Sequence, residues 1–318
     1  MDLVTADDVR AAATRIAGLV VRTPLTAGPG SDAGFCLKPE SLQPTGAFKL
    51  RGAGNAVALL GPDRSANGVV THSSGNHGLA LAQAARAQGV ACTVVVPEGA
   101  PPVKVDRIRD TGARVELVPV EERLARARQM EEEQGLSLVP PFDDPNVIAG
   151  QGTVGLEILE QSPDVETIVV PVGGGGLASG VATAARTVPG VKVVGVEPEL
   201  AADAAESLRL GRRVVWPDQR TGRTMADGVR TGLSDRTYAH LKARSEGIVT
   251  VTEDEIAHAV AVLARQARLV TEPSGALAAA ALLSGRVPSD PARPESTVAV
   301  VSGGNVDPDL FARLLATA

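Results

Sequence analysis

The order of apolar and polar positions predicts short strands and helices in regular alternation. Behind Thr5, the positions Val9, Ala12 and Ile16 repeat at helical spacing, so a helix capped by Thr5 is expected near the start. From about residue 67, valine-rich runs alternate with longer helical stretches, as in βα units of a parallel sheet covered by helices on both faces. The predicted strands are 35–38, 68–72, 91–97 and 114–118, and the predicted helices are 53–60, 79–87, 103–110 and 120–134.

A second series of the same kind begins near Val147. Because strands and helices alternate in both series, the chain is assigned to the α/β class, with twisted, mostly parallel sheets flanked by helices. The least regular stretch, 212–231, is expected to form ordered loops near a site. The predicted strands of this series are 167–172, 191–196 and 297–301, and the predicted helix is 177–187.

Composition narrows the possible functions. The 318 residues suggest about two domains, and the core must be aliphatic because only 2% of the residues are aromatic. The net charge is −6 and no basic stretch is interleaved with aromatic residues, so nucleic-acid binding is not expected. No apolar run approaches the ~20 residues of a membrane span. The first residues lack an apolar signal core, and Cys36 and Cys92 lie far apart, which favours a cytoplasmic protein without disulfides.

Three glycine- or serine-rich turns each follow a predicted strand directly, at 73–78 (SSGNHG), 173–176 (GGGG) and 302–305 (SGGN). Ligands of parallel α/β sheets bind beyond the carboxyl ends of the strands, so the shared position of these turns predicts one ligand site. Lys49 lies in an apolar run, PTGAFKLRGA, that would partly desolvate its amine and make it nucleophilic. A solvated surface lysine is the alternative.

The run Gly173–Gly176 is the candidate phosphate site. Glycine lets the backbone approach an anion closely, and the helix that follows offers unpaired N–H groups and the positive end of its dipole. A tight turn without a ligand is the alternative, but four consecutive glycines cost backbone entropy that such a turn does not require. The same glycines also begin a pattern typical of dinucleotide-binding sites, which ends at Glu197. This pattern is weak evidence for a dinucleotide cofactor, because such a cofactor would leave Lys49 without a role.

The turn at 73–78 is rich in hydroxyl and backbone N–H groups that suit a substrate carboxylate at a helix start. Within it, Asn76 is a candidate donor to a ring oxygen. His77 is a candidate base, although a lone histidine at a helix start is more often structural. Ser302 is either a turn cap or a hydroxyl bonded to a pyridine nitrogen. With the amine of Lys49, these features suggest pyridoxal phosphate held as a Schiff base.

The combination and order of these motifs resemble the fold-type II pyridoxal-phosphate enzymes, in the branch of the threonine/serine dehydratases and serine racemases. The similarity runs from 37–43 (LKPESLQ) to 302–305 (SGGN), which is essentially the whole chain. The resemblance implies a homodimer and two α/β domains of the tryptophan synthase β type, with the cofactor between them. The larger domain would comprise 1–58 and 146–318, and the smaller one, 59–145, would close over the substrate.

The resemblance also implies a role for each motif. Lys49 is expected to carry the cofactor, with Phe48 beside the ring and Asn76 at its phenolic oxygen. The other implied sites are the phosphate cradle (Gly173, Gly174, Gly175, Gly176, Leu177), the pyridine-nitrogen partner (Ser302) and the substrate carboxylate site (Ser73, Ser74, Gly75, Asn76, His77).

Glu197 has a second interpretation within this family. Glu197, Ala201 and Asp203 resemble, in their spacing, the divalent-cation site of the racemase-like members. Two carboxylates and a backbone carbonyl are hard oxygen ligands that suit Mg²⁺ or Ca²⁺ as a structural or activating ion. A solvated acidic helix start is the alternative.

The activity that the resemblance implies is β-elimination, in which a hydroxy amino acid such as L-threonine or L-serine becomes a 2-oxo acid and ammonia. The alternative activity is that of a serine racemase, which needs a second base on the face of the cofactor opposite Lys49. The racemase-like members have a serine as this base, and Ser74 occupies its position. The run 141–145 (PFDDP), in contrast, resembles the dehydratases. A threo-3-hydroxyaspartate ammonia-lyase, with Arg51 or Arg230 at the second carboxylate, is a further alternative. An inactive cofactor-holding homologue is disfavoured by the intact Lys49 and Ser74.

Overall fold

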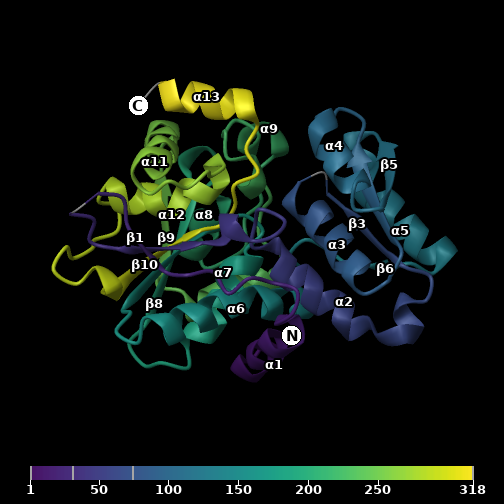
Figure 1. Ribbon diagram of the computed structural model, residues 1–318, viewed down its shortest axis with the longest axis horizontal. Coiled ribbons are helices and arrows are strands. Elements are labelled where there is room, and N and C mark those ends of the chain that lie inside the picture. Colours follow the sequence, from purple (N-terminus) through teal and green to yellow (C-terminus); the bar gives the residue numbers. More distant parts are fainter. Residues whose placement is uncertain (1, 31, 74, 317–318) are drawn as a thin grey trace.

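The computed structural model describes residues 2–30, 32–73 and 75–316, which form two sheets flanked by helices (Figure 1). The larger sheet has six strands in the order β1-β2-β10-β7-β8-β9, and all neighbours are parallel except the antiparallel pair β1 and β2. These strands are β1 (Thr26–Ala27), β2 (Cys36–Pro39), β7 (Thr167–Pro171), β8 (Lys192–Pro198), β9 (Gly247–Val251) and β10 (Thr297–Val301).

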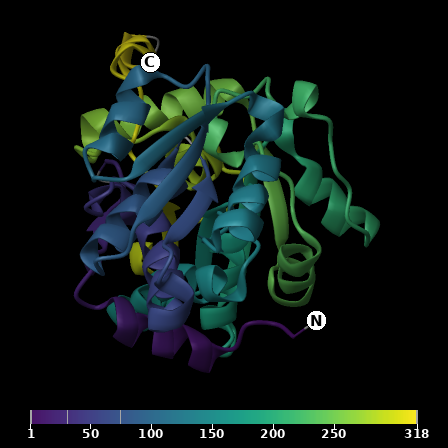
Figure 2. The same ribbon diagram turned by 90° about the vertical axis from the view of Figure 1, so that its right-hand side faces the viewer.

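The smaller sheet has four parallel strands in the order β5-β4-β3-β6 and faces the viewer in Figure 2. The α/β class is therefore confirmed. The predicted limits of the smaller domain, 59–145, stay a prediction, and all four strands lie inside them. These strands are β3 (Val69–His72), β4 (Cys92–Pro97), β5 (Arg114–Val118) and β6 (Ser137–Leu138).

Helices cover both faces of each sheet, and their starts follow from local capping. Thr5 and Asp8 form the reciprocal capping box of α1, which confirms the predicted cap, and the Asp144 side chain accepts the first free N–H groups of α6. The helices are α1 (Ala6–Ile16), α2 (Lys49–Ser65), α3 (Asn76–Ala87), α4 (Pro102–Arg109), α5 (Arg123–Gln134), α6 (Pro145–Gln161), α7 (Gly176–Ala185), α8 (Asp203–Leu210), α9 (Asp218–Thr221), α10 (Asp235–Arg244), α11 (Glu253–Gln266), α12 (Pro273–Leu283) and α13 (Pro308–Ala316).

The core of the larger sheet is aliphatic on both faces, as the low aromatic content requires. Along β7, Ile168 and Val170 pack against α6, α7 and α10, whereas Val169 between them packs against α11 and α12. This alternation places a hydrophobic layer on each side of the strands. The order of layers is helix, sheet and helix, and it holds the carboxyl ends of β7, β8 and β10 at one edge (Figure 1).

Helix α2 joins the two parts of the molecule (Figure 1). It begins at Lys49, against the larger sheet, and its later residues pack against α3 beside the smaller sheet. The helix bends at Gly61, which has a left-handed φ of 66° and precedes Pro62. The single chain segment that carries Lys49 therefore also supports the smaller sheet.

Most predicted elements of the first two hundred residues are confirmed within a few positions, and the stretch 232–296 was not assigned from the sequence. It contains α10, β9, α11, α12 and a 3₁₀ turn, η5 (Pro294–Ser296). The stretch 212–231, predicted as loops, contains the short helix α9 and the 3₁₀ turn η4 (Asp227–Val229). The other 3₁₀ turns are η1 (Glu40–Leu42), η2 (Val120–Glu122) and η3 (Glu199–Ala201).

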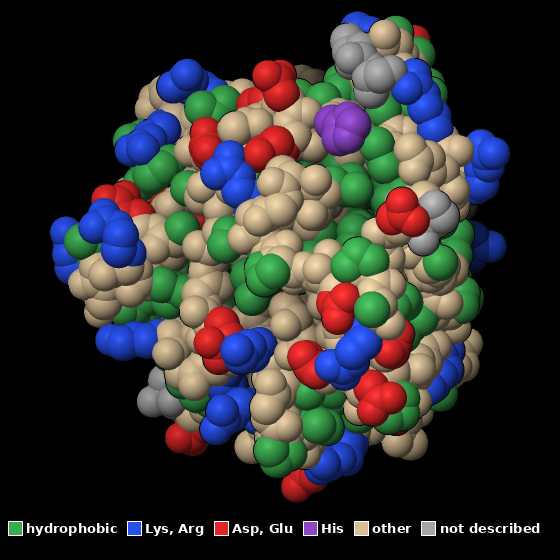
Figure 3. Space-filling view, turned by 90° about the vertical axis from the view of Figure 1, so that its left-hand side faces the viewer, with side chains coloured by type: hydrophobic (Ala, Val, Ile, Leu, Met, Phe, Trp, Pro, Cys, Tyr) green, Lys and Arg blue, Asp and Glu red, His purple; other side chains and the backbone are tan. Residues whose placement is uncertain are grey.

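On the face of the molecule seen in Figure 3, acidic and basic side chains are interspersed. Among the helices of the described residues, none combines the length and the apolar character that crossing a bilayer requires.

Candidate active site

Lys49 is the first residue of α2, where three chain segments meet. The N–H of Phe48 donates to the carbonyl oxygen of Ser302 (3.0 Å), and Ala47 forms an isolated bridge with Gly303. The amine of Lys49 donates to the carbonyl oxygen of Pro141 (2.7 Å) and lies 5.1 Å from the centre of the Phe48 ring. Desolvation lowers the pKa of the Lys49 amine to about 8, so the neutral amine is a far larger fraction near physiological pH than for an ordinary lysine.

The glycine run follows β7 and leads into the N-terminus of α7. Gly175 has a φ of +82°, a left-handed conformation that favours glycine. A methyl group at Gly174 would lie 2.5 Å from Cδ1 of Phe142. Close packing accounts for Gly174, and the backbone conformation accounts for Gly175. The free N–H groups at the start of α7 remain available to an anion.

Phe142 connects the glycine run to Lys49. Its ring lies against Gly174 and its backbone lies near Gly176, whereas the preceding residue, Pro141, accepts the hydrogen bond of the Lys49 amine. The stretch between β6 and α6 thus brings the amine and the candidate phosphate cradle, Gly173–Gly176 with Leu177, into one site.

Asn76 is the first residue of α3 and lies directly beyond β3. Its amide nitrogen donates to Oε1 of Glu272 (2.6 Å), and its amide oxygen accepts from Nδ2 of Asn305 (2.7 Å). Glu272 and Asn305 both belong to the larger sheet's side of the molecule. Asn76 therefore lies in the same region as Ser302 and Lys49.

The turn at 73–78 lies at the carboxyl end of β3. The Gly75 N–H donates to Oγ of Ser73 (3.3 Å). His77 is buried, and its Nε2 lies 3.0 Å from the carbonyl oxygen of Val139. Burial, and then the charge of Lys49, lowers the pKa of His77 to about 3, so the ring is neutral and suits the structural interpretation. Ser74 lies outside the described residues.

Ser302 follows β10 and is buried. Its hydroxyl makes only a long contact with the carbonyl oxygen of Ser274 (3.5 Å). The hydroxyl therefore has hydrogen-bonding capacity left for a ligand. Its carbonyl, through the bond to Phe48, fixes the distance between β10 and the start of α2.

The predicted cation residues lie apart from this group, beyond β8. Glu197 and Asp203 are buried, and the Glu197 carboxylate accepts the N–H groups of Ala204 (3.1 Å) and Ala205 (2.7 Å) at the start of α8. Oδ2 of Asp203 is buried without a hydrogen-bond partner. Burial, and then the charge of Asp203, raises the pKa of Glu197; burial, and then the charge of Glu206, raises that of Asp203.

These residues fit a divalent cation, because a buried carboxylate oxygen without a partner beside a second carboxylate offers the hard oxygen ligands that such an ion prefers. Within residues 2–30, 32–73 and 75–316, no group of three or more His, Cys, Asp or Glu side chains converges as a metal site. Any ion here would need the Ala201 carbonyl and water besides the two carboxylates. One turn along α8 from Asp203, Glu206 accepts the indole N–H of Trp216 (2.6 Å).

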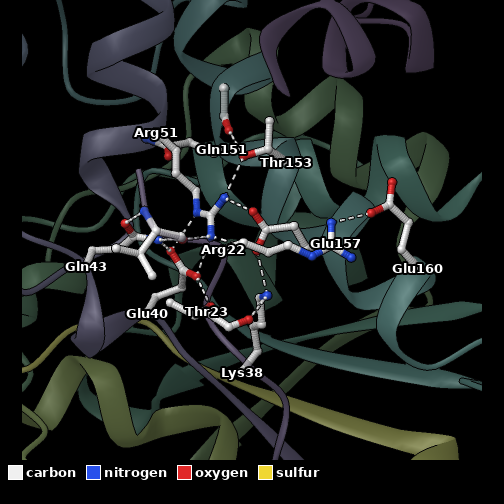
Figure 4. A network of polar contacts seen from close by, with 12 residues as sticks. Arg22, Thr23, Lys38, Glu40, Gln43, Arg51, Gln151, Thr153, Glu157 and Glu160 are labelled. Carbon is white, nitrogen blue, oxygen red and sulfur yellow. Dashed lines mark hydrogen bonds and ion pairs between the residues drawn. The ribbon is translucent and has the colours of Figure 1, made fainter. Parts of the chain in front are cut away.

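Arg51 does not bind a substrate carboxylate, which corrects one hypothesis from the sequence. Its side chain is fully buried, and its guanidinium holds both oxygens of Glu40 (2.7 Å each) and contacts Glu157 (2.7 Å) (Figure 4). Lys38 completes this buried network through a 2.6 Å contact with Glu157. Arg51 therefore joins α2 to the 3₁₀ turn η1, which follows β2, and to α6.

Arg230, the other candidate for a second carboxylate, is exposed. Its guanidinium donates twice to the carbonyl oxygen of Thr224 (2.5 and 3.2 Å). Arg51 therefore offers no free charge to a substrate, whereas Arg230 keeps its charge and its other N–H donors.

Sequence reasoning missed Glu272 altogether and gave no role to Asn305 or Phe142. Glu272 precedes Pro273 at the start of α12, and Asn305 ends the SGGN turn. The sequence signal that could have identified Glu272 as a site residue is its place directly before the Pro-Ser-Gly segment that begins α12.

Comparison with known proteins agrees with this site. Residues 16–303 match the family described as "Pyridoxal-phosphate dependent enzyme". A serine racemase from Oryza sativa subsp. indica is 40% identical over 308 residues, covering 94% of this chain and 90% of the relative. An L-threonine ammonia-lyase from Thermotoga maritima is 39% identical over 322 residues, covering 98% of this chain and 78% of the relative.

The fold is shared as well. The structure of maize serine racemase superimposes with a TM-score of 0.92 at 35% identity, covering 99% of this chain and 98% of that one. Both comparisons span nearly the whole chain, including Lys49, the glycine run and Ser302. The chain therefore belongs to the family of pyridoxal-phosphate dependent enzymes.

Proposed function

We propose that the protein converts a hydroxy amino acid such as L-threonine or L-serine to a 2-oxo acid and ammonia. The observation that carries this proposal is the Lys49 amine, which has a pKa lowered to about 8. It bonds to Pro141, next to the residue that packs on the glycine run, and follows Phe48, which bonds to Ser302. Relatives named L-threonine ammonia-lyase support the reaction class.

Each predicted residue has a function in this proposal. Lys49 holds the cofactor, and Phe48 packs beside it. The N–H groups of Gly173–Gly176 and Leu177 bind the phosphate, the Ser302 hydroxyl faces the ring nitrogen, and Asn76 faces the ring oxygen. The turn comprising Ser73, Ser74, Gly75, Asn76 and His77 binds the substrate carboxylate.

Bound pyridoxal phosphate supplies an electron sink for the electrons that the departing α proton leaves behind. The neutral Lys49 amine takes this proton from Cα, and the low pKa suits it as a base near neutral pH. Net loss of water and later hydrolysis yield the 2-oxo acid and ammonium. His77 keeps the segment beside Lys49 in place through its bond to Val139.

The experiment is to supply L-threonine and L-serine to the holoenzyme and to measure 2-oxo acid and ammonia in equal amounts. Lys49→Ala should abolish both products and the visible absorbance of the cofactor. Lys242→Ala, which changes a lysine on α10 that contacts Tyr238, is the matched control and should retain both. Turnover by Lys49→Ala would refute the assignment.

Racemisation is the second candidate, favoured by Ser74 and by the relatives named serine racemase. It needs a second acid or base on the face of the cofactor opposite Lys49. Chiral chromatography of L-serine incubated with the enzyme separates the candidates. If D-serine forms faster than pyruvate, racemisation is the main reaction. Ser74→Ala should then suppress D-serine and spare pyruvate.

A divalent cation, Mg²⁺ or Ca²⁺, is proposed for Glu197, Asp203 and the carbonyl of Ala201. The unpartnered Asp203 oxygen supports it, and the ion would stabilise the start of α8. It would lie apart from the reaction site, beyond β8, and take no part in the chemistry.

We also infer a homodimer, a cytoplasmic location and a smaller domain at 59–145 that closes over the substrate. The first rests on the resemblance, the second on the free thiols of Cys36 and Cys92, and the third on the separate four-stranded sheet. Light scattering of the holoenzyme would test the dimer.

A further inference from the structure

Asn76 lies in the middle of a chain of hydrogen bonds that begins and ends on other elements. Nη1 of Arg107 donates to Oδ1 of Asn305 (2.8 Å), and Nδ2 of Asn305 donates to Oδ1 of Asn76 (2.7 Å). Nδ2 of Asn76 then donates to Oε1 of Glu272 (2.6 Å). Nδ2 of Asn305 also donates to the carbonyl oxygen of Thr45 (2.8 Å), four residues before Lys49.

The polarity of this chain is fixed at its ends. A guanidinium only donates, so the Asn305 atom facing Arg107 must be its oxygen; the carbonyl of Thr45 only accepts, so the other Asn305 atom must be its nitrogen. The Asn76 atom facing Asn305 is then its oxygen, and its nitrogen must face Glu272. An ionised Glu272 accepts this bond, which completes a consistent direction from Arg107 to Glu272.

The chain crosses three times between the two parts of the molecule, once at each of its hydrogen bonds. Arg107 on α4 and Asn76 on α3 flank the smaller sheet, whereas Asn305 and Glu272 follow β10 and precede α12 of the larger part (Figure 1). Both polar atoms of the Asn76 amide are therefore bonded to residues of the larger part, the oxygen to Asn305 and the nitrogen to Glu272. One hydrogen of its Nδ2 is left for another acceptor.

Glu272 is surrounded by charges of both signs. Its side chain is buried, and burial, followed by the charge of Asp227, raises its pKa to about 7. The hydrogen bond from Asn76 and the charges of Lys104 and Arg107 oppose this rise. Lys104 also pairs with Asp227 (3.1 Å). Like the contact of Arg107 with Asn305, this pair joins a side chain of α4 to the larger part of the molecule.

We propose that Glu272 and Asn305 are positioning residues, which orient the Asn76 amide so that its remaining Nδ2 hydrogen serves the ring oxygen of pyridoxal phosphate. This inference rests on the proposed role of Asn76 in cofactor binding. Neither residue exchanges a proton with substrate. Each acts through Asn76, and Arg107 strengthens the chain from its outer end because consecutive hydrogen bonds polarise one another.

The test is a double-mutant cycle on cofactor binding, read from visible absorbance during titration of the apoprotein with pyridoxal phosphate. Glu272→Ala should raise the dissociation constant about tenfold, ~1.4 kcal/mol, and shift the pH titration of the visible band. In the Asn76→Ala background, the same substitution should change neither quantity. Glu272→Gln keeps an acceptor oxygen of the same reach, so it should restore binding to within about threefold of the wild type.

Asn305→Ala provides a second route to the same result, because it removes the partner of the Asn76 oxygen. Its effect should likewise vanish in the Asn76→Ala background. Arg107→Ala should weaken binding by a smaller factor, about threefold. Arg109→Ala, on the same helix but in an exposed pair with Asp106, is the matched control and should leave the dissociation constant unchanged.

Additive effects of Glu272→Ala and Asn76→Ala would overturn the proposal, as would wild-type binding and an unshifted band in both Glu272→Ala and Asn305→Ala. The cycle also separates this inference from the proposed function. A wild-type enzyme that binds pyridoxal phosphate but makes no 2-oxo acid refutes the reaction and leaves the hydrogen-bond chain intact. An active wild type with an additive cycle refutes only the chain.

Discussion

The ring of Phe142 occupies the space that a side chain at Gly174 would need, with Cδ1 only 2.5 Å from an added methyl group. Gly174→Ala should therefore overpack the site, lower the free energy of unfolding by about 1–3 kcal/mol and weaken cofactor binding. Urea unfolding of the apoprotein measures the first effect. Gly18→Ala, where nothing lies within 4 Å, is the control, and Phe142→Ala in the Gly174→Ala background should restore part of the loss.

The lowered pKa of Lys49 predicts how cofactor loading depends on pH. Only the neutral amine attacks the cofactor aldehyde, and with a pKa of about 8 its neutral fraction rises steeply between about pH 7 and 9. The rate at which apoprotein gains visible absorbance should rise through the same interval and level off above it. A rate that climbs without levelling to pH 10 would indicate an ordinary, solvated lysine.

Glu272 predicts an opposite dependence for the stability of the apoprotein. Its pKa is raised from 4.5 to about 7 on folding, so the folded protein binds the extra proton between these values. Its contribution to stability is present below pH 4.5 and is lost as the pH rises through 7. Glu272→Gln should thus gain stability relative to the wild type from pH 5 to pH 8, by up to about 3 kcal/mol. A constant difference across this range would contradict the raised pKa.

The buried ion network predicts a large difference between two arginines that each pair with a glutamate. Arg51→Met leaves the fully buried Glu40 without its main partner and should cost about 3–5 kcal/mol. Arg22→Met breaks the exposed pair with Glu160 and should cost less than about 1 kcal/mol. Thermal unfolding of both apoproteins gives the comparison. Near-equal losses would show that the network is solvated in solution.

The cation proposal predicts a stabilisation that depends on one oxygen. Saturating Ca²⁺ or Mg²⁺, at about a hundred times the dissociation constant, should stabilise the wild type by ~2.7 kcal/mol. Asp203→Asn should remove this gain, and without added cation it should be no less stable than the wild type, because it relieves the pair with Glu197. Asp218→Asn, an exposed change at α9, should respond like the wild type.

How much the sequence could predict depends on the range of the interactions involved. The cap at Thr5, the strand before Gly173 and the turn after β3 follow from neighbouring residues, and these were placed correctly. The interactions of Glu272 and Arg51 are with residues 196 and 106 positions away. Local pattern holds no information on such pairs, so a ligand role for Arg51 stayed open as an alternative and Glu272 was overlooked.

The indole of Trp216, bonded to Glu206, has a consequence for how this protein can be observed. Because the chain has one tryptophan, its tryptophan fluorescence has a single origin, on the loop beside α8. Emission excited at the red edge should therefore report on occupancy of the acidic pair Glu197 and Asp203. The Trp216 emission should not respond to changes confined to the vicinity of β3 and α4. A fluorophore attached there would therefore give an independent optical signal.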